Sequence, residues 1–359
     1  MSRPLIIDGS QGEGGGQILR TALSLAAIEG RALRIEKIRA GRPNPGLAAQ
    51  HVTCVRAVAA LCRADVSGDE IGSRRLDFAP RAAVKAGDYA FDISAARKGG
   101  SAGATSLVLQ AVLVPLALAR GDSRVSLRGG THVAWSPPFD YLQQVWLPAL
   151  ARLGIAADLE LGRSGWYPAG EGEIRALVCG LGPETRGRLR PLALLDRGPL
   201  EGVTGRAIAA NLPLHIAQRM AGRARDLLRA DGIDAAIEAA TAKAACPGAG
   251  LFLTARYHAV ACGFSALGER GKRAEQVGEE AAGALLAHWR SGAALDRHLA
   301  DQLLLPLALA RGPSSFSAQA ITQHLRSNAF VIERFGLAEV RLSVGEGEAG
   351  IVDVIPAAT

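Results

Sequence analysis

The stretch PLALARG occurs twice in this chain of 359 residues, at positions 115–121 and at 306–312. Each copy ends an apolar segment with helical spacing and turns at a glycine, and an alternating, strand-like segment follows. Each strand then leads into a polar loop, which begins near Thr131 in the first copy and near Thr322 in the second. A repeated pattern of this kind predicts a fold assembled from equivalent units.

A weaker copy of the same pattern lies at residues 18–41. Its helix is expected to end at Gly30, its strand covers Leu33–Ile38, and its loop starts at Arg39. Each of the three loops leads toward a second helix, and a further strand follows two of these helices. The expected second helices are Pro45–Leu61, Pro138–Leu153 and Arg326–Phe335, and the expected strands are Ala156–Leu161 and Glu339–Val344.

The repeats favour an α/β (α+β) fold in which three β-α-β-α-β units are arranged around a pseudo-threefold axis. A single unit cannot bury its apolar face alone, so the units are expected to cover one another. The sequence changes character between residues 188 and 277, which interrupts the third unit. We therefore predict a large domain of three repeats over 1–187 and 278–359, with a smaller α/β domain inserted at 188–277. The helical segment that ends the insertion is expected to rejoin the large domain.

Three equivalent loops are candidates for the functional site. In a threefold arrangement, the loops at Arg39, Thr131 and Thr322 would lie on one side of the molecule. Sites in α/β proteins gather in loops at strand ends. We therefore expect these loops to form the walls of one pocket.

The composition is typical of a soluble globular protein, with 48% hydrophobic, 21% charged and 4% aromatic residues. The most apolar run, residues 104–119, contains Gln110 and Pro115, so a buried helix is expected there and no membrane span. The N-terminus lacks the layout of a signal peptide, which makes a cytoplasmic location the default. The five cysteines show no CxxC spacing, which argues against a zinc site or a disulfide framework.

The formal net charge of +7 is carried mainly by arginine, since only five of the 41 basic residues are lysines. The guanidinium group suits phosphate, and an excess of positive charge favours a polyanionic partner such as nucleic acid. A bias of the source genome toward arginine would explain the same numbers.

The glycine-rich segment DGSQGEGGGQILR, residues 8–20, is the strongest local signal for a phosphate site. It lacks the Gly-Lys-Ser/Thr ending of a P-loop and does not match the dinucleotide-binding pattern GxGxxG. The chain also has no GxSxG, HExxH or KxDG motif, which disfavours a serine hydrolase, an HExxH metal site and a lysine-dependent nucleotidyltransferase.

His324 differs from the other histidines because it lies in a polar loop. The loop precedes an expected helix, which Ser327 or Asn328 would help to cap. A histidine in this position could serve as a base, a metal ligand or a nucleophile.

Several segments together resemble one family. The segments DGSQGEGGGQILRTALSL, IRAGRPNPGLAAQH, LVLQ, HLADQLLLPLALA and QHLRSN occur in the order seen in the RNA 3'-terminal phosphate cyclases, and the resemblance runs over essentially the whole chain. The fold of that family is similar to the one that the repeats predict. The resemblance implies an enzyme that uses ATP and a divalent metal, Mg or Mn, and acts on RNA with a 3'-phosphate end.

The resemblance also implies a reaction. A histidine attacks the α-phosphate of ATP and releases pyrophosphate, and the adenylyl group passes to the RNA 3'-phosphate. The neighbouring 2'-hydroxyl then attacks, AMP leaves, and a 2',3'-cyclic phosphate remains. The position that matches the nucleophile is His324.

Further roles follow from the same resemblance. Glu13 matches the carboxylate that holds the metal, and positions around the triphosphate and metal are matched by Gln17, Arg20, Arg39 and Gln50. Nucleotide-binding positions are matched by Gln110 and by His298, Leu299, Ala300, Asp301 and Gln302. Without the resemblance, solvent-facing or core roles would explain Gln17, Arg20, Gln110 and Asp301 equally well.

The sequence departs from the family pattern at several places, of which two concern candidate site residues or their surroundings. His298 stands where relatives often carry a tyrosine that stacks on adenine, and Glu171 replaces one of three successive glycines. Two alternatives stay open: a non-catalytic cyclase-like factor in RNA processing, and an enzyme that resembles the enolpyruvyl transferases. The oligomeric state is not predicted.

Overall fold

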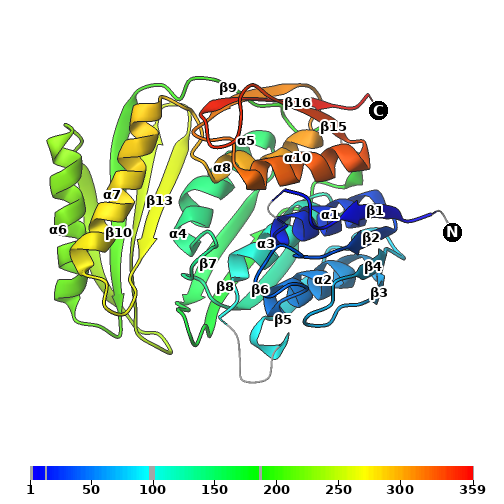
Figure 1. Ribbon diagram of the computed structural model, residues 1–359, viewed down its shortest axis with the longest axis horizontal. Coiled ribbons are helices and arrows are strands. Elements are labelled where there is room, and N and C mark those ends of the chain that lie inside the picture. Colours follow the sequence, from blue (N-terminus) through cyan, green and yellow to red (C-terminus); the bar gives the residue numbers. More distant parts are fainter. Residues whose placement is uncertain (1–2, 13, 97–101, 186–187, 359) are drawn as a thin grey trace.

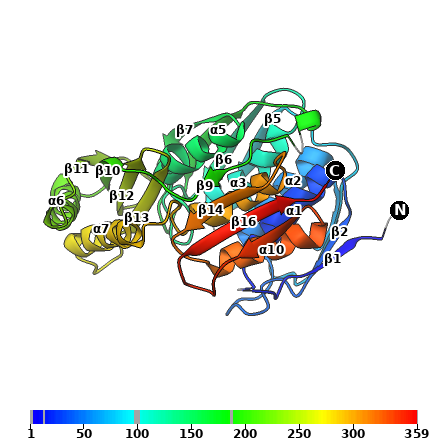
Figure 2. The same cartoon turned by 90° about the horizontal axis from the view of Figure 1, so that it is seen from above.

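The computed structural model describes residues 3–12, 14–96, 102–185 and 188–358. These residues form four sheets of four strands each, with helices packed on them (Figure 1). The α/β class is thereby confirmed. The inserted segment lies at one end of the molecule in both views, and the N-terminal unit lies at the other (Figure 2).

The first unit is N-terminal and contains two helices. Its elements are β1 (Leu5–Asp8), α1 (Gly16–Glu29), β2 (Leu33–Glu36), α2 (Ala49–Cys62), β3 (Asp65–Ser67) and β4 (Leu76–Ala79). Helix α1 ends where Gly30 adopts a left-handed φ of 60°, as the sequence predicts. The sheet has the order β1-β2-β4-β3.

The second unit follows the same plan with longer strands. Its elements are β5 (Asp88–Asp92), a 3-10 turn (Ser94–Ala96), α3 (Thr105–Ala117), β6 (Ser123–Gly129), α4 (Phe139–Tyr141), a π-helical segment (Leu142–Trp146), α5 (Leu147–Leu153), β7 (Ala157–Arg163) and β8 (Gly172–Val178). A 3-10 turn (Pro183–Thr185) follows this unit. The sheet order is β5-β6-β8-β7.

The third unit is split by the insertion. Its elements are β9 (Ala193–Leu194), α8 (Leu299–Gln302), α9 (Leu304–Ala308), β14 (Ser314–Ala318), α10 (Gln323–Phe335), β15 (Ala338–Leu342) and β16 (Gly350–Pro356). The sheet order is β15-β16-β14-β9. Both PLALARG copies close a helix and lead into the second strand of their unit, β6 or β14.

One topology recurs in these three sheets. The first two strands are parallel, and the fourth strand lies antiparallel between the second and the third. Each unit is therefore β-α-β-α-β-β, one strand more than predicted. The additional strands β4, β8 and β16 return beside the preceding strand as hairpins, which add a hydrogen-bonded neighbour with little extra loop.

The helices of the units pack together inside the sheets. Helix α1 contacts α2, α3 and α10, which joins the first unit to the second and the third. Every residue of α3 except Gln110 is buried, so the apolar run at 104–119 forms a buried helix as predicted. Leu, Val and Ala fill this central layer, which explains how a chain with few aromatic residues builds a large core.

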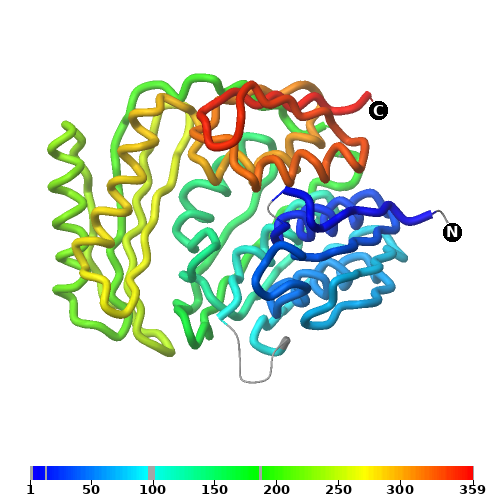
Figure 3. Tube along the Cα trace, in the orientation of Figure 1, coloured from blue at the N-terminus to red at the C-terminus, as the bar shows by residue number. Residues whose placement is uncertain are grey.

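The inserted segment forms a separate sheet with two helices. Its elements are β10 (Leu200–Ala210), α6 (Leu214–Ala230), β11 (Ala235–Ala242), β12 (Gly248–Tyr257), β13 (Ala261–Leu267) and α7 (Ala274–Ser291). The sheet order is β11-β10-β12-β13. Figure 3 shows the chain leaving the third unit for this sheet and returning to it.

Helix α7 corrects one expectation. It packs on α6, β12 and β13, whereas the sequence analysis expected it to rejoin the large domain. Helix α7 carries apolar residues on the side that covers the inserted sheet, and periodicity alone does not say which sheet a helix covers. The division at residues 188–277 stays a prediction, and the contacts of α7 favour a later second boundary.

Helix α10 begins three residues earlier than expected. Thr322 is its N-cap, and the Thr322 Oγ1 accepts a hydrogen bond from the Leu325 backbone N at 3.1 Å. His324 therefore lies in the first helical turn, and Ser327 and Asn328 lie inside the helix. A threonine hydroxyl satisfies an otherwise unpaired N–H, which fixes where the helix starts.

No helix of the described residues is long and apolar enough to cross a membrane.

A buried histidine closes the first turn of α2. The His51 Nδ1 accepts a hydrogen bond from the Ala48 backbone N at 3.0 Å. Burial, together with the charges of Arg20 and Arg39, lowers the pKa of His51 to about 3. A Cβ at Gly16 would lie 2.3 Å from the His51 Nε2, so the start of α1 needs glycine to approach this ring.

We predict that His51 makes stability depend on pH. Its pKa in the folded state lies below the ordinary value of 6.5. The unfolded chain therefore binds more protons below pH 6.5, and stability falls as pH decreases, by about 1.4 kcal/mol per unit until the folded-state pKa is reached. Urea unfolding of His51→Gln between these values should show a shallower slope than the wild type. An unchanged slope would contradict this assignment, and the exposed His215→Gln is the control.

A second prediction concerns Arg197, which is buried between the third unit and α7. Its guanidinium donates to the carbonyls of His288 at 2.9 Å, Trp289 at 2.6 Å and Ala293 at 3.0 Å. Arg197→Met leaves these acceptors buried without this donor and should lower the free energy of unfolding by about 2–4 kcal/mol. Denaturant unfolding measures the change. Arg290, which forms an exposed salt bridge with Asp231, is the matched control. Arg290→Met should lower the free energy of unfolding by less than about 1 kcal/mol.

Candidate active site at the start of helix α10

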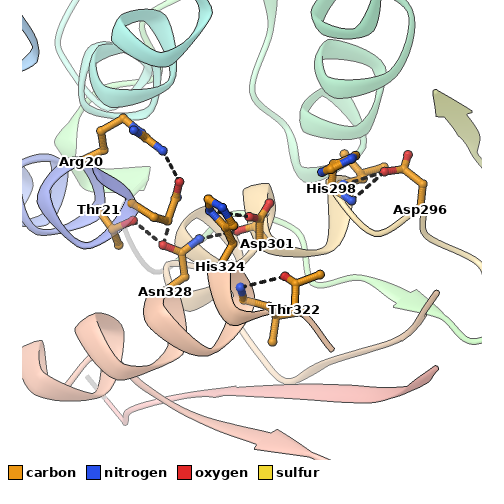
Figure 4. A network of polar contacts seen from close by, with 11 residues as sticks. Arg20, Thr21, Asp296, His298, Asp301, Thr322, His324 and Asn328 are labelled. Carbon is orange, nitrogen blue, oxygen red and sulfur yellow. Dashed lines mark hydrogen bonds and ion pairs between the residues drawn. The ribbon is translucent and has the colours of Figure 1, made fainter. Parts of the chain in front are cut away.

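A buried amide, Asn328, joins the first unit to the third. The Asn328 Oδ1 accepts hydrogen bonds from the Thr21 Oγ1 at 2.5 Å and from the Gln17 Nε2 at 3.1 Å. The Asn328 Nδ2 donates to the backbone carbonyl of Asp301 at 2.8 Å (Figure 4). Helix α10 thereby holds α1 on one side and α8 on the other.

His324 lies one turn before Asn328 on the same helix. The His324 Nδ1 is 3.8 Å from the Asp301 Oδ2, and both side chains point toward each other in Figure 4. The imidazole is 46% exposed, whereas the carboxylate is only 10% exposed. A carboxylate beside Nδ1 favours the tautomer with the proton on Nδ1, which leaves the Nε2 lone pair available for chemistry.

Two arginines make the region beside α1 strongly positive. Arg20 is buried and donates to the Gln17 Oε1. Arg39 donates to the carbonyls of Asn44 at 2.9 Å and Gly46 at 2.8 Å. Burial and the charge of Arg42 lower the pKa of Arg39. The pKa of His51 responds to both Arg20 and Arg39, which places the three side chains in one electrostatic neighbourhood.

Three glutamines from the sequence analysis lie on the helices around this region. The Gln50 Oε1 accepts a hydrogen bond from the Ala104 backbone N at 3.3 Å, which links α2 to the start of α3. The Gln110 Nε2 and the Gln302 Oε1 are buried and have no hydrogen-bond partner among the described residues. A buried amide atom without a partner is costly, so both atoms are suited to a polar ligand.

The short helix α8 is fixed by a buried carboxylate. The Asp296 Oδ1 accepts hydrogen bonds from the backbone N of His298 and of Leu299, both at 2.9 Å. The side chains of Leu299 and Ala300 are buried in the core, and the side chain of His298 is exposed. Leu299 and Ala300 therefore support the site by packing, whereas His298 lies at the surface, where partial desolvation still lowers the pKa of its ring.

The metal-binding prediction is not tested by the structure. Glu13 lies outside the described residues. Within the described ranges, no group of three or more His, Cys, Asp or Glu side chains could hold a metal ion.

The loop at Thr131 is held differently from the other two candidate loops. The backbone N of Thr131 and of His132 donate to the Gly165 carbonyl at 2.9 and 3.0 Å. This loop thus lies against the β7–β8 hairpin. The residues around Arg39 and Thr322 lie instead beside α1 and at the start of α10.

The sequence analysis missed the organising role of Asn328, which it considered only as a helix cap. It also missed Thr21 and Asp296. Asp296 carries a recognisable signal, because an aspartate two or three residues before a helical segment commonly accepts hydrogen bonds from backbone N–H groups. No local pattern identifies Asn328, since its partners are 27, 307 and 311 residues away.

Comparisons with known proteins show which family the chain resembles over most of its length. The family described as RNA 3'-terminal phosphate cyclase matches residues 11–342. A protein named RNA 3'-terminal phosphate cyclase from Methylococcus capsulatus is 62% identical over 350 residues, which cover 98% of this chain and 96% of that protein. Proteins of the same name from Trichormus variabilis and Archaeoglobus fulgidus are 52% and 44% identical, and the matches cover 95% and 92% of this chain and 96% and 94% of theirs.

A solved structure, the enolpyruvyl transferase NikO from Streptomyces tendae, aligns over 100% of this chain and 84% of its own with 14% identity. Its TM-score is 0.23, which is too low to support any conclusion.

The match of the family over residues 11–342 and the relatives of 44–62% identity establish the family. The chain belongs to the RNA 3'-terminal phosphate cyclase family.

Proposed function

We propose that this protein uses ATP to convert the 3'-terminal phosphate of RNA into a 2',3'-cyclic phosphate, through an adenylylated His324. The observation that carries the proposal is the position of His324. Its half-exposed ring stands at the N-terminus of α10 and faces the Asp301 carboxylate, beside the arginines next to α1. Membership of the family supports the same activity.

The first step forms a phosphoramidate. The Nε2 lone pair of His324 attacks the α-phosphorus of ATP, a P–N bond forms, and the bond between the α-phosphorus and the oxygen that bridges to the β-phosphate breaks. Pyrophosphate leaves with that oxygen. Asp301 keeps the proton on Nδ1 and stabilises the positive charge that develops on the ring.

The next two steps return the histidine and close the ring. An oxygen of the RNA 3'-phosphate attacks the adenylyl phosphorus, and the P–N bond breaks with the imidazole as leaving group. The oxygen of the 2'-hydroxyl then attacks the 3'-phosphorus and its proton passes to solvent, while the bond from that phosphorus to the oxygen that bridges to AMP breaks. AMP leaves, and the cyclic phosphate remains. Positive charge from Arg20 and Arg39 stabilises the additional negative charge of each transition state.

We assign nucleotide binding to polar groups that lack a hydrogen-bond partner within the described part of the chain and to one exposed ring. We assign the buried amide atoms of Gln110 and Gln302 to polar contacts with ATP, and the exposed His298 ring to stacking on the base. The N-terminus of α10 favours a phosphate group beside His324, because its N–H groups point toward the ligand. We also keep Gln17 and Gln50 as residues that would contact the triphosphate.

A divalent metal, Mg or Mn, remains part of the proposal through Glu13. Such an ion would neutralise phosphate charge when bound.

We also infer that the three units are arranged about a pseudo-threefold axis and that the inserted sheet forms a smaller domain. The shared strand order of the three sheets supports the first inference. The packing of α6 and α7 on the inserted sheet supports the second. A cytoplasmic location stays an expectation.

Labelling the protein with ATP tests the proposed nucleophile. Wild-type protein with α-labelled ATP and Mg²⁺ or Mn²⁺, without RNA, should form a labelled adduct that is acid-labile and alkali-stable. His324→Ala should abolish the label, while His258→Ala should keep it, because His258 pairs with Glu201 on the exposed surface of the insertion. An unlabelled wild-type protein would favour the non-catalytic alternative. Full labelling of His324→Ala would exclude this nucleophile.

Asn328 provides a test of the network behind His324. Asn328→Ala removes the acceptor for Thr21 and Gln17 and the donor to Asp301, so His324 and Asp301 lose their fixed spacing. The rate of adduct formation should fall by about 100-fold, as expected for a small misplacement of reacting groups. Thr21→Val removes one of the three hydrogen bonds and should have a smaller effect. Equal rates for Asn328→Ala and the wild type, with folding verified by circular dichroism, would refute the positioning role.

A further inference from the structure

Two aromatic side chains, Trp135 and Tyr167, lie on the surface and do not pack into a core. Trp135 is 97% exposed and Tyr167 is 77% exposed, more than any other large hydrophobic side chain of the described residues. Trp135 also has a positive φ of 64°, a strained conformation for a bulky residue. Since neither ring packs into a core, both are available to a partner.

The loops that carry the two rings are fixed to each other. Besides the two backbone hydrogen bonds from Thr131 and His132 to Gly165, the rings of His132 and Trp166 stack with centroids 4.9 Å apart and an angle of 16°. Trp135 follows His132 by three residues, and Tyr167 follows Trp166 by one. The exposed rings therefore flank one rigid junction.

The same junction contacts the inserted sheet. The buried Trp166 packs against Gly248, where a Cβ would lie 2.2 Å from the indole ring. Ser164 forms a β-bridge with Ala244, and the Asn211 side chain holds Ala244 by hydrogen bonds of 2.7 and 3.2 Å. The turn between β11 and β12 thus sits at a fixed position beside the β7–β8 hairpin.

A hollow of about 470 Å³ opens where the hairpin meets this turn, lined by Leu161, Gly162, Arg163, Ser164, Lys243 and Ala244. One basic side chain lines the hollow from each side: Arg163 from the hairpin and Lys243 from the insertion. Lys243 forms no salt bridge with any residue that the structure describes. Within the described part of the chain, the salt bridge of Arg163 is a long one, with 3.9 Å between its NH1 and the Glu171 Oε2, and Glu173 is its cross-strand partner.

Nearby negative charge is largely neutralised. Glu173 lies beside Gly162, but Arg175 holds its carboxylate with two hydrogen bonds of 3.0 and 3.3 Å and lowers its pKa. The hollow therefore carries positive side chains, and the loops that bear the two exposed rings adjoin the hairpin that forms one of its walls. Proteins that bind single-stranded nucleic acid combine these two features, because cations track the phosphates and aromatic rings stack on the bases.

We propose that Trp135, Arg163, Tyr167 and Lys243, which we call the aromatic–basic surface, bind single-stranded RNA upstream of the 3' end that His324 processes. This proposal rests on the proposed function for the identity of the RNA end. It gives the inserted segment a role, since Lys243 supplies one wall of the hollow.

The surface connects to the site through α4. The Trp135 loop runs directly into α4, where the Tyr141 hydroxyl donates to Asp296 at 2.9 Å. Asp296 fixes the start of α8, which carries Asp301. These contacts connect the loop that carries Trp135 to the helix that carries Asp301, so they fix the position of the aromatic–basic surface relative to the site.

Glu171 limits binding at this surface. Its carboxylate lies 3.9 Å from the Arg163 guanidinium and would compete with an RNA phosphate for it. Glu171→Gln removes the charge and preserves the size of the side chain. We expect this variant to bind RNA more tightly, by about two- to fivefold, which is the size of an exposed ion-pair effect.

Binding is measured by fluorescence anisotropy with 3'-phosphorylated RNAs of about 20 and about three nucleotides, since single-strand sites cover about 4–16 nucleotides. Tyr167→Ala and Trp135→Ala should each weaken binding of the long RNA by about tenfold, the scale of one stacked base. Arg163→Ala with Lys243→Ala should lower the salt slope by about 1.4, since each single-strand phosphate contact contributes about 0.7. Binding of the short RNA and adduct formation with ATP should remain as in the wild type.

The controls separate this proposal from the proposed function. Arg229→Ala with Arg270→Ala removes two exposed arginines of the insertion outside the hollow and should leave the salt slope nearly unchanged. If all surface variants form the adduct and bind the long RNA normally, the role of the aromatic–basic surface is refuted and the proposed reaction is retained. Loss of long-RNA binding in a protein that never forms an adduct would support the surface and sink the proposed reaction. Unchanged RNA binding with altered sedimentation of Trp135→Ala would identify a protein interface and overturn the RNA assignment.

Discussion

The site depends on one buried side chain, the amide of Asn328. A primary amide offers both donors and acceptors, and Asn328 uses both kinds within a region closed to water. Because its partners lie on α1 and α8, a single side chain fixes the relative positions of the first and third units. The low local dielectric makes these bonds strong and makes any unpaired member costly, so the arrangement is held as a set.

Helix geometry places the proposed nucleophile beside this junction. His324 and Asn328 are four residues apart on α10, which places them on the same face of the helix. The amide that binds the backbone of Asp301 therefore also sets the separation between the Asp301 carboxylate and the imidazole. The cap at Thr322 starts the helix before His324, so the ring stands on a rigid element at the positive end of the helix dipole. A loop would leave the same ring more freedom.

The sequence predicted the α/β class correctly, because apolar residues with helical and strand spacing need burial, and the arrangement of three units about an axis stays a proposal. The incorrect predictions concern features that contacts between distant residues determine. The start of α10 was placed too late because Ser327 and Asn328 are good caps in isolation, yet Thr322 fills that role. Helix α7 was assigned to the wrong neighbour because amphipathicity reveals a buried face but not what covers it. The family resemblance matched Gln17, Arg20, Asp301 and His324 to site positions, and the structure connects these residues through Asn328, while their roles stay proposals. The role of Asn328 was not predicted, because a single asparagine in a helix belongs to no recognisable sequence pattern.

Electrostatics gives a reason for the site to prefer a polyphosphate. Arg20 and Arg39 both act on His51, and burial with these charges keeps the imidazole neutral at physiological pH. Arg39 itself has a lowered pKa because of burial and the charge of Arg42. Cations that disfavour further positive charge in this way gain from a bound anion. In the proposed reaction, the triphosphate would relieve their repulsion before the transition state is reached. The same fixed charges would then stabilise the pyrophosphate as it departs, with no side chain needing to move.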